Sequence, residues 1–124
     1  MIIGAAVVAV VVLAGLAVLQ VQLAAGRPLG HLAWGGQHRV LPPRLRIGSA
    51  VSIVLYAVFG GVVVGAAVGA PTPGRGLEVG IWVLTGYFTL GVLVNAVSRS
   101  RPERQVMTPV SLVLAGCCLV VALA

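Results

Sequence analysis

Four long apolar segments alternate with short polar ones along the chain. The apolar segments cover about residues 2–25, 44–70, 77–97 and 101–124. Each is close to the roughly 20 residues that an α-helix needs to cross the hydrocarbon core of a bilayer. The pattern predicts an all-α fold, a transmembrane four-helix bundle with short loops, in which residues 1–124 form a single transmembrane domain.

Turn and capping signals set the ends of two of these helices. Pro43 suits the first position of the second helix, where its missing N–H costs nothing. Ser100 and Glu103 have the spacing of a capping box, which predicts that the fourth helix begins near Arg101. Pro109 offers a rival start or a kink. A start at Pro109 would leave a segment too short for a span, so we favour the earlier start with a kink.

The composition fits a chain surrounded by lipid rather than water. Hydrophobic residues make up 60% of the chain and charged residues 8%, whereas soluble domains carry about 25% charged residues. The net charge is +6, and every basic residue is an arginine. Such a charge in a soluble protein would suggest nucleic acid, but these arginines flank apolar segments and act as topology signals. We therefore expect the lipid bilayer as a partner and no nucleic acid.

The arginines are divided unevenly between the two sides of the predicted bundle. Four spans place the first and third loops on one side, and the second loop and both termini on the other. The first side holds seven arginines, Arg27, Arg39, Arg44, Arg46, Arg99, Arg101 and Arg104, and the second side holds Arg75. The positive-inside rule then predicts a bacterial inner (plasma) membrane protein with loops 1 and 3 cytoplasmic and both termini outside. Arginines at this position can also contact anionic lipid headgroups, and Arg44 and Arg46 are expected to reach toward them.

Most other polar side chains gather toward the same side. They are Gln20, Gln22, His31, Gln37, His38, Ser49, Ser52, Asn95, Ser98, Ser100, Glu103 and Thr108. Polar groups are costly in a membrane and usually find partners inside the bundle. We therefore place a candidate ligand- or lipid-binding site at the cytoplasmic mouth, formed by Gln20, Trp34, His38, Arg39, Arg44, Arg46, Asn95, Arg99 and Glu103. The alternative is that these groups cap helices and meet water at the interface.

Side chains suited to catalysis or metal binding are scarce. His31 and His38 lie in a loop without Cys, Asp or Glu, whereas zinc sites take three or four convergent ligands. We therefore predict no catalytic residue, no metal and no cofactor, and an enzyme is not favoured. The adjacent Cys117 and Cys118 would point about 100° apart on a helix, which disfavours a disulfide between them.

A polar track through the bundle is a further possibility. Ser52, Tyr56, Thr85, Thr89 and Asn95 lie within the apolar segments and would line a small anion channel if they faced one another. The predicted membrane cores hold no charged residue, which argues against a proton-coupled exporter that uses an intramembrane carboxylate.

Small residues recur at four-residue spacing in the second helix. Ala57, Gly61, Gly65 and Gly69 would lie along one helix face. Such a stripe lets two helices approach closely in lipid, where packing drives association. It predicts a helix-packing surface, and hence a homo-oligomer or a membrane protein partner, although glycines are also common in membrane helices for no such reason.

Two stretches resemble a known family. They are GHLAWGGQHRVLPPRLRIGSAVS and GYFTLGVLVNAVSRSRPERQVMTP, and they are similar to a family of small four-helix bacterial integral membrane proteins with no assigned activity. The shared pattern comprises Trp34, Gly35, Gly36, Leu41, Pro42, Arg44, Arg46, Asn95, Ser98, Glu103, Thr108 and Pro109. The resemblance implies the four-helix fold, and there is no assigned activity to carry over from the family.

The sequence favours two hypotheses for function over a third, an enzyme or redox-cofactor protein that uses His31 and His38. The first is a non-enzymatic membrane protein that self-associates or serves as a membrane subunit. The second is a small channel or transporter with a polar or anion-binding site at its cytoplasmic mouth.

Overall fold

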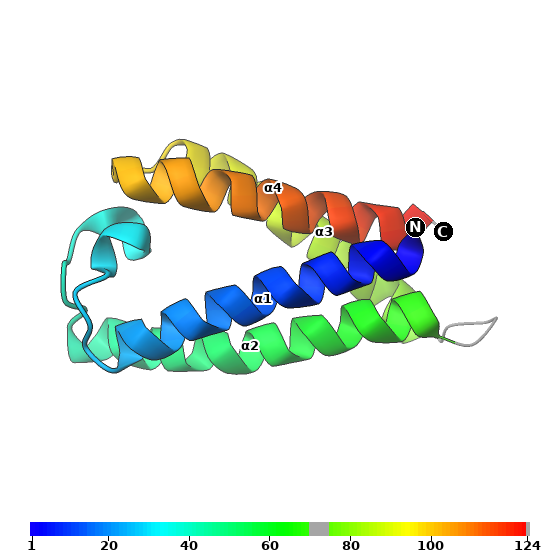
Figure 1. The fold of residues 1–124 in the computed structure, drawn as a ribbon, viewed down its shortest axis with the longest axis horizontal. Coiled ribbons are helices and arrows are strands. Elements are labelled where there is room, and N and C mark those ends of the chain that lie inside the picture. Colours follow the sequence, from blue (N-terminus) through cyan, green and yellow to red (C-terminus); the bar gives the residue numbers. More distant parts are fainter. Residues whose placement is uncertain (70–74, 124) are drawn as a thin grey trace.

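The computed structural model describes residues 1–69 and 75–123, and this part of the chain is helical with no strands (Figure 1). The long helices are α1 (Ile2–Ala24), α2 (Pro43–Val68), α3 (Arg75–Ala96) and α4 (Arg101–Leu123). Two short 3₁₀ helices, η1 (Gly30–Leu32) and η2 (Trp34–Gly36), lie between α1 and α2. All four long helices are long and apolar enough to cross a membrane, which confirms the predicted fold class.

The helix ends lie close to their predicted positions. Helix α2 ends at Val68 and Gly69 has an extended backbone, so Gly69 lies outside the helix that carries the small-residue stripe. Ala70 and Ala124, the predicted last residues of the second and fourth helices, lie outside the described residues. Helix α4 begins at Arg101 and continues through Pro109, so the earlier start is correct.

The four helices form two antiparallel pairs. Helix α1 packs along α2, and α3 packs along α4, while contacts between α1 and α4 join the pairs. In Figure 1 the pairs lie closest together near the two termini and diverge toward the opposite end. The loop between α1 and α2 folds over that opposite end, which is also where α3 connects to α4.

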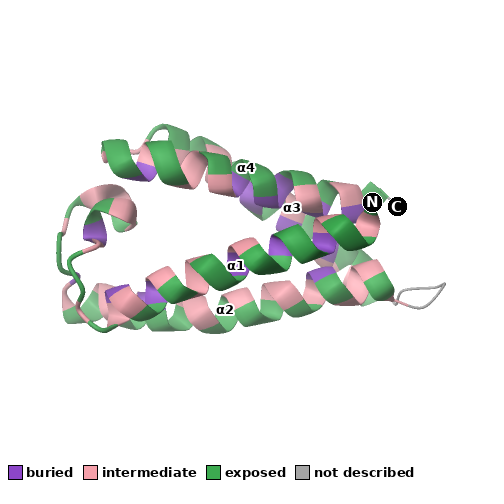
Figure 2. Ribbon diagram, viewed as in Figure 1, coloured by how far each residue is buried: buried purple, intermediate pink, exposed green. Residues whose placement is uncertain are grey.

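The apolar core occupies the half of the bundle nearest the termini. Its members are Ala6, Ala9, Leu13, Val63, Ile81, Leu84, Phe88, Leu114, Ala115, Cys118 and Val121. Small alanines of α1 allow α4 to approach, because a methyl group takes little space between two helices. Exposed residues cover the outward faces of the bundle (Figure 2), where apolar side chains such as Val11 and Leu93 would contact lipid.

Arg46 of α2 joins the ends of α1 and α2. Its Nε donates a hydrogen bond of 2.8 Å to the carbonyl oxygen of Ala24, the last residue of α1. Helix C-terminal carbonyls lack partners within their helix and carry partial negative charge, so an arginine there stabilises the helix end. Arg46 therefore caps the neighbouring helix through its Nε, and its contact with headgroups stays a prediction.

Candidate ligand pocket at the arginine-rich end

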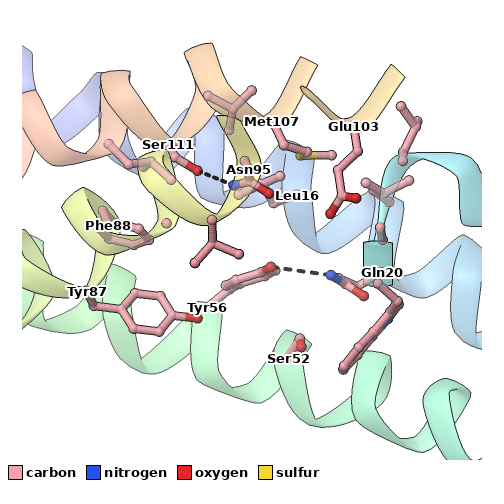
Figure 3. Close-up of a pocket in the computed structure, with 18 of the residues that line it drawn as sticks. Leu16, Gln20, Ser52, Tyr56, Tyr87, Phe88, Asn95, Glu103, Met107 and Ser111 are labelled. Atoms are coloured by element: carbon pink, nitrogen blue, oxygen red, sulfur yellow. Dashed lines mark hydrogen bonds between the residues drawn. The ribbon is translucent and has the colours of Figure 1, made fainter. Parts of the chain in front are cut away.

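A pocket of about 340 Å³ opens between the two helix pairs at the end where they diverge. Its polar lining residues are Gln20, Ser52, Asn95, Glu103 and Ser111, and its aromatic ones are Trp34, Tyr56, Tyr87 and Phe88. Apolar residues such as Leu16, Met107 and Leu114 complete the wall. All four long helices contribute (Figure 3), so the pocket lies between the helix pairs, and it is partly open because the lining residues Tyr87, Leu90 and Val94 are exposed.

Gln20 enters the pocket from the buried face of α1 and is only 8% exposed. Its Nε2 donates to the hydroxyl of Tyr56 on α2 at 3.3 Å, as the dashed line in Figure 3 marks. Its Oε1 is buried and has no hydrogen-bond partner. A buried unpaired acceptor costs about 1–3 kcal/mol, so the Gln20 amide lowers the free energy of unfolding of the bundle.

Glu103 lines the pocket from the first turn of α4 and is also 8% exposed. Only half of the predicted capping box forms: the N–H of Glu103 donates to Ser100 Oγ at 3.4 Å. The N–H of Ser100 donates to Ser98 Oγ at 3.2 Å, and Ser98 Oγ in turn donates to Glu103 Oε2 at 2.6 Å. Ser98 thus takes the capping role predicted for the glutamate, and the carboxylate turns toward the bundle interior.

The opposite wall of the pocket is fixed by a bond between α3 and α4. Asn95 Nδ2 donates to Ser111 Oγ at 2.9 Å, and Figure 3 shows this pair above the cavity. Ser111 also packs against Gly91, one turn before Asn95, where a Cβ would make an ordinary van der Waals contact of 3.5 Å with its Oγ. The bond therefore holds two pocket-lining polar groups at a fixed place between the helices.

A cluster of aromatic rings lies where the pocket meets the apolar core, and its member Phe88 belongs to both. Tyr56, Phe59, Tyr87 and Phe88 form a cluster in which neighbouring ring centroids are 5.3 to 6.3 Å apart. The Phe59 and Phe88 rings meet edge to face at an interplanar angle of 89°, an arrangement that aromatic quadrupoles favour. This cluster forms the floor of the pocket on the side of the termini.

Trp34 lines the pocket from the loop between α1 and α2. Its Nε1 donates to the buried Ser49 Oγ at 3.2 Å, and its ring lies over Gly48, where a Cβ would meet the ring at 2.8 Å. Its φ of 54° lies in the left-handed region that non-glycine residues seldom adopt. Residues held in such conformations cluster at binding sites, where the surrounding structure compensates for the strain.

The same loop is fastened to the connection between α3 and α4. Ser100 Oγ donates a hydrogen bond to the carbonyl of His31, and a Cβ on Gly36 would overlap the Ser100 side chain. Within the loop, the Gly30 N–H donates to the Arg39 carbonyl at 2.9 Å and the Gly36 N–H to the Ala33 carbonyl at 2.9 Å. The glycine pair therefore forms a tight turn, and the loop makes a cap over the pocket.

The structure places only some residues of the predicted candidate site in the pocket. Gln20, Trp34, Asn95 and Glu103 meet around the pocket, whereas His38, Arg39, Arg44, Arg46 and Arg99 do not line it. Arg39, Arg44 and Arg99 are exposed, as are Arg27 and Arg101, so they form a basic rim outside the cavity. We refer to these five arginines as the rim.

The predicted polar track is only partly assembled. Ser52, Tyr56 and Asn95 line the pocket, but Thr85 and Thr89 are not among its lining residues. Each threonine hydroxyl instead donates to a carbonyl of its own helix, Ile81 at 2.8 Å and Thr85 at 2.7 Å. Polar lining is thus confined to one end of the bundle and does not run through it along α3.

Sequence reasoning missed Met107, Tyr87 and Ser111 as pocket residues. Glu103, Met107 and Ser111 follow one another at four-residue intervals, and such residues share one face of a helix. Extending the helical face from Glu103 along α4 would have found both of the missed residues on that helix.

The small residues of the α2 stripe have two different kinds of neighbour. A Cβ on Gly65 would lie 3.2 Å from Leu77 of α3, whereas a Cβ on the exposed Gly61 would meet nothing within 4 Å. Ala57 and Gly61 line a groove of about 520 Å³ between α1 and α2, together with Ala14 and Ala17. Gly65 thus serves packing inside the bundle, and the groove lies open on its outside.

Within the described parts of the chain, no group of three or more His, Cys, Asp or Glu residues is placed to hold a metal ion. Comparison of the chain with protein-family models, with curated proteins and with solved structures gives no match.

Proposed function

We propose that this chain is a non-enzymatic multi-pass protein of the bacterial plasma membrane that binds a small solute in the pocket between its helix pairs. In this proposal the arginine-rich end faces the cytoplasm and both termini face outside. The protein acts on its solute as a small channel or transporter does, by admitting it from the capped end of the bundle.

The burial of Glu103 and Gln20 carries this proposal. Both side chains are 92% removed from solvent in a bundle whose helices suit a bilayer, and both line one cavity. Polar and ionisable groups buried in the bundle of a membrane protein are costly, and they are candidates for a functional site by default. The Ser98 hydroxyl meets only part of the acceptor capacity of a carboxylate, which has about four lone-pair positions.

A purely structural role explains these groups less well. Helix capping would direct Glu103 toward the Ser100 N–H, yet Ser98 occupies that N–H. Contact with interfacial water would leave the side chains exposed, as the rim arginines are. A buried carboxylate beside an unpaired amide oxygen is instead suited to a ligand that supplies hydrogen-bond donors.

Filling the pocket tests the proposal. Ser52 lines the pocket and its hydroxyl bonds only to its own helix, at the Gly48 carbonyl. Ser52→Leu should therefore occupy the cavity without breaking a bond between helices. Thr89→Leu is the matched control, because Thr89 makes the same kind of bond on an exposed face.

We expect Ser52→Leu to abolish solute binding by the purified protein and solute flux in proteoliposomes, and Thr89→Leu to preserve both. The solutes should cover inorganic anions, organic cations and uncharged polar molecules. Background flux together with absence of binding for all three classes in the wild-type protein would refute the proposal.

Self-association through the groove between α1 and α2 is the second candidate function. Ala14, Ala17, Ala57 and Gly61 line this groove, and small residues allow helix backbones to approach closely in lipid. A helix of a second copy, or of a membrane partner, would fill it. Light scattering of the purified protein in detergent gives the oligomeric state directly, and a monomer at all protein concentrations would refute this candidate.

Labelling of single cysteines tests the proposed orientation. In a chain with Cys117 and Cys118 replaced by alanine, Gln37→Cys would lie in the capping loop and Arg75→Cys at the opposite end. Both native residues are exposed. A membrane-impermeant maleimide should label Arg75→Cys and spare Gln37→Cys in intact cells, and the reverse pattern would contradict the cytoplasmic placement of the rim.

The rim supports anionic lipid as a partner. Each arginine near an anionic membrane surface contributes about 1 kcal/mol of attraction, and the five rim arginines are exposed at one end of the bundle. Native mass spectrometry should therefore show retention of phosphatidylglycerol over phosphatidylcholine, with the preference reduced when Arg39, Arg44 and Arg99 are replaced by glutamine.

A further inference from the structure

We infer that the solute is a small organic cation, an ammonium group on an apolar or aromatic body, whose charged nitrogen lies beside Glu103. This inference rests on the proposed solute-binding function and specifies its ligand class. The residues that line the pocket favour a cationic solute, although the many arginines of the chain would suggest an anionic one.

Charge gives the first argument. Among the described residues that line the pocket, Glu103 is the one with a formal charge. The rim arginines are exposed outside it, and the two less exposed arginines of this end bond to backbone carbonyls: Arg46 to Ala24 and Arg104 to Ser98. A solute inside the cavity therefore meets negative charge and no cation.

The surroundings of the carboxylate give the second argument. Backbone N–H groups at a helix N-terminus can stabilise a carboxylate, but those of Ser100 and Glu103 donate to serine hydroxyls instead. Glu103 Oε2 accepts a hydrogen bond from Ser98 Oγ. Since a buried charge is costly unless it is paired, the pocket side of the carboxylate is suited to a positively charged donor.

The Gln20 amide adds a second acceptor. Figure 3 shows Glu103 descending from α4 toward Gln20 of α1 across the same space. Oε1 of Gln20 has no partner while Nε2 is used by Tyr56. A hydrogen-bond donor in the cavity toward which the Gln20 amide turned would remove the cost of the unpaired oxygen. A group with several N–H bonds can therefore donate to Glu103 and to Gln20 at once.

The remaining walls suit the body of such a cation. Trp34, Tyr56, Tyr87 and Phe88 supply aromatic surface, and Leu16 and Leu114 supply aliphatic surface. A cation within about 6 Å of an aromatic ring gains about 0.5–2 kcal/mol, more when desolvated. A volume of about 340 Å³ lies at the small end of ligand sites, which span about 300–1,000 Å³.

The positive rim does not exclude a cationic solute. Interactions between exposed charges are screened over about 8–10 Å at physiological ionic strength, and anionic headgroups would lie against the rim. Buried charges are screened much less, so Glu103 dominates the potential that a solute meets inside the cavity.

Three small probes that share a phenyl ring and differ in charge test the inference: benzylammonium, benzyl alcohol and benzoate. Binding of each to the purified full-length protein in detergent is measured by isothermal titration calorimetry. We expect benzylammonium to bind at least about tenfold more tightly than benzyl alcohol, which corresponds to about 1.4 kcal/mol, and benzoate to bind least. Ser52→Leu should remove the binding of all three and thereby separates pocket binding from partition into the micelle.

Glu103→Gln should abolish the preference for benzylammonium over benzyl alcohol. Glu78→Gln is the control, because Glu78 is exposed in the first turn of α3 at the opposite end of the bundle. Glu103→Asp keeps the charge and should keep the preference with lower affinity, which gives a reading should the glutamine variant fail to fold.

The outcomes separate the inference from the proposed function. If benzyl alcohol or benzoate binds as tightly as benzylammonium and Ser52→Leu removes that binding, the pocket binds solutes but the cation inference is wrong. A preference that survives Glu103→Gln also overturns the inference. If no probe binds in a way that depends on Ser52, the cation inference fails, and the proposed function is then decided by the wider set of solutes used to test it.

Discussion

Replacing Gln20 with leucine tests the energetics of the pocket directly. Gln20 lies on the buried face of α1, its Nε2 donates to Tyr56 at 3.3 Å, and its Oε1 has no partner. Leucine has a similar size and no polar atoms, so Gln20→Leu removes the unpaired oxygen and the Tyr56 bond together. We predict that this loss of polarity stabilises the fold.

The magnitude follows from two opposing contributions. Removing a buried unpaired acceptor recovers about 1–3 kcal/mol. Losing a hydrogen bond between membrane helices costs about 0.6 kcal/mol on average, and the Tyr56 hydroxyl can turn toward the pocket that it lines. The free energy of unfolding should therefore rise by about 1 kcal/mol, while binding of the solute weakens.

Equilibrium unfolding in mixed micelles with a rising fraction of dodecyl sulfate measures this difference, with the fluorescence of Trp34 and Trp82 as the signal. Gln22→Leu is the control, because Gln22 lies on the same helix, is half-buried and does not line the pocket. A Gln20→Leu protein that is less stable by about 1 kcal/mol, beside an unchanged Gln22→Leu protein, would mean that the amide oxygen has a partner and would refute the reasoning.

Three further predictions concern helix packing, the capping loop and the end of α1. Gly61→Leu should weaken association in detergent and leave the helix content, measured by circular dichroism, unchanged. Gly65→Leu should instead lower the temperature of the unfolding midpoint, because even a Cβ at this position would meet Leu77 of α3. If both variants changed association and thermal stability equally, Gly61 and Gly65 would not have the separate roles described above. Gly36→Val should separate the capping loop from Ser100 and increase proteolysis of loop 1 in detergent, and unchanged cleavage would argue against the cap. Arg46→Met should cost about 1–2 kcal/mol of unfolding free energy by removing a charge-assisted bond to a helix end, and hydrogen exchange should show fraying confined to the C-terminus of α1.

The fold was predictable because the bilayer limits the possible structures. A run of apolar residues of the right length has few alternatives to a helix in lipid, where every backbone N–H and C=O must be bonded within the segment. The two signals that set helix starts, Pro43 and the Ser100–Glu103 spacing, place α2 and α4 to within a residue. The arrangement of the capping box was less predictable, because Ser98 competes for the same N–H.

The candidate site was only partly predictable. Gln20, Asn95 and Glu103 stand out because they are polar residues in or beside apolar segments. The arginines were grouped with them by sequence position, but long flexible side chains at helix ends can turn toward any acceptor in reach, and Arg46 turned to Ala24, which is 22 residues away. Contacts of this kind depend on how α1 and α2 meet, and helical periodicity within one segment does not contain that information.

The unequal distribution of packing along the bundle has a mechanical consequence. Helix α1 has 23 residues and is about 35 Å long at 1.5 Å per residue, so a rotation of about 5° at the tightly packed end would displace the far end by about 3 Å. At that far end, the contact of His31 with Ser100 links the loop of one hairpin to the connection of the other. The contacts of His31 and Gly36 with Ser100 therefore lie where a small rotation at the packed end would produce the largest separation of the two hairpins.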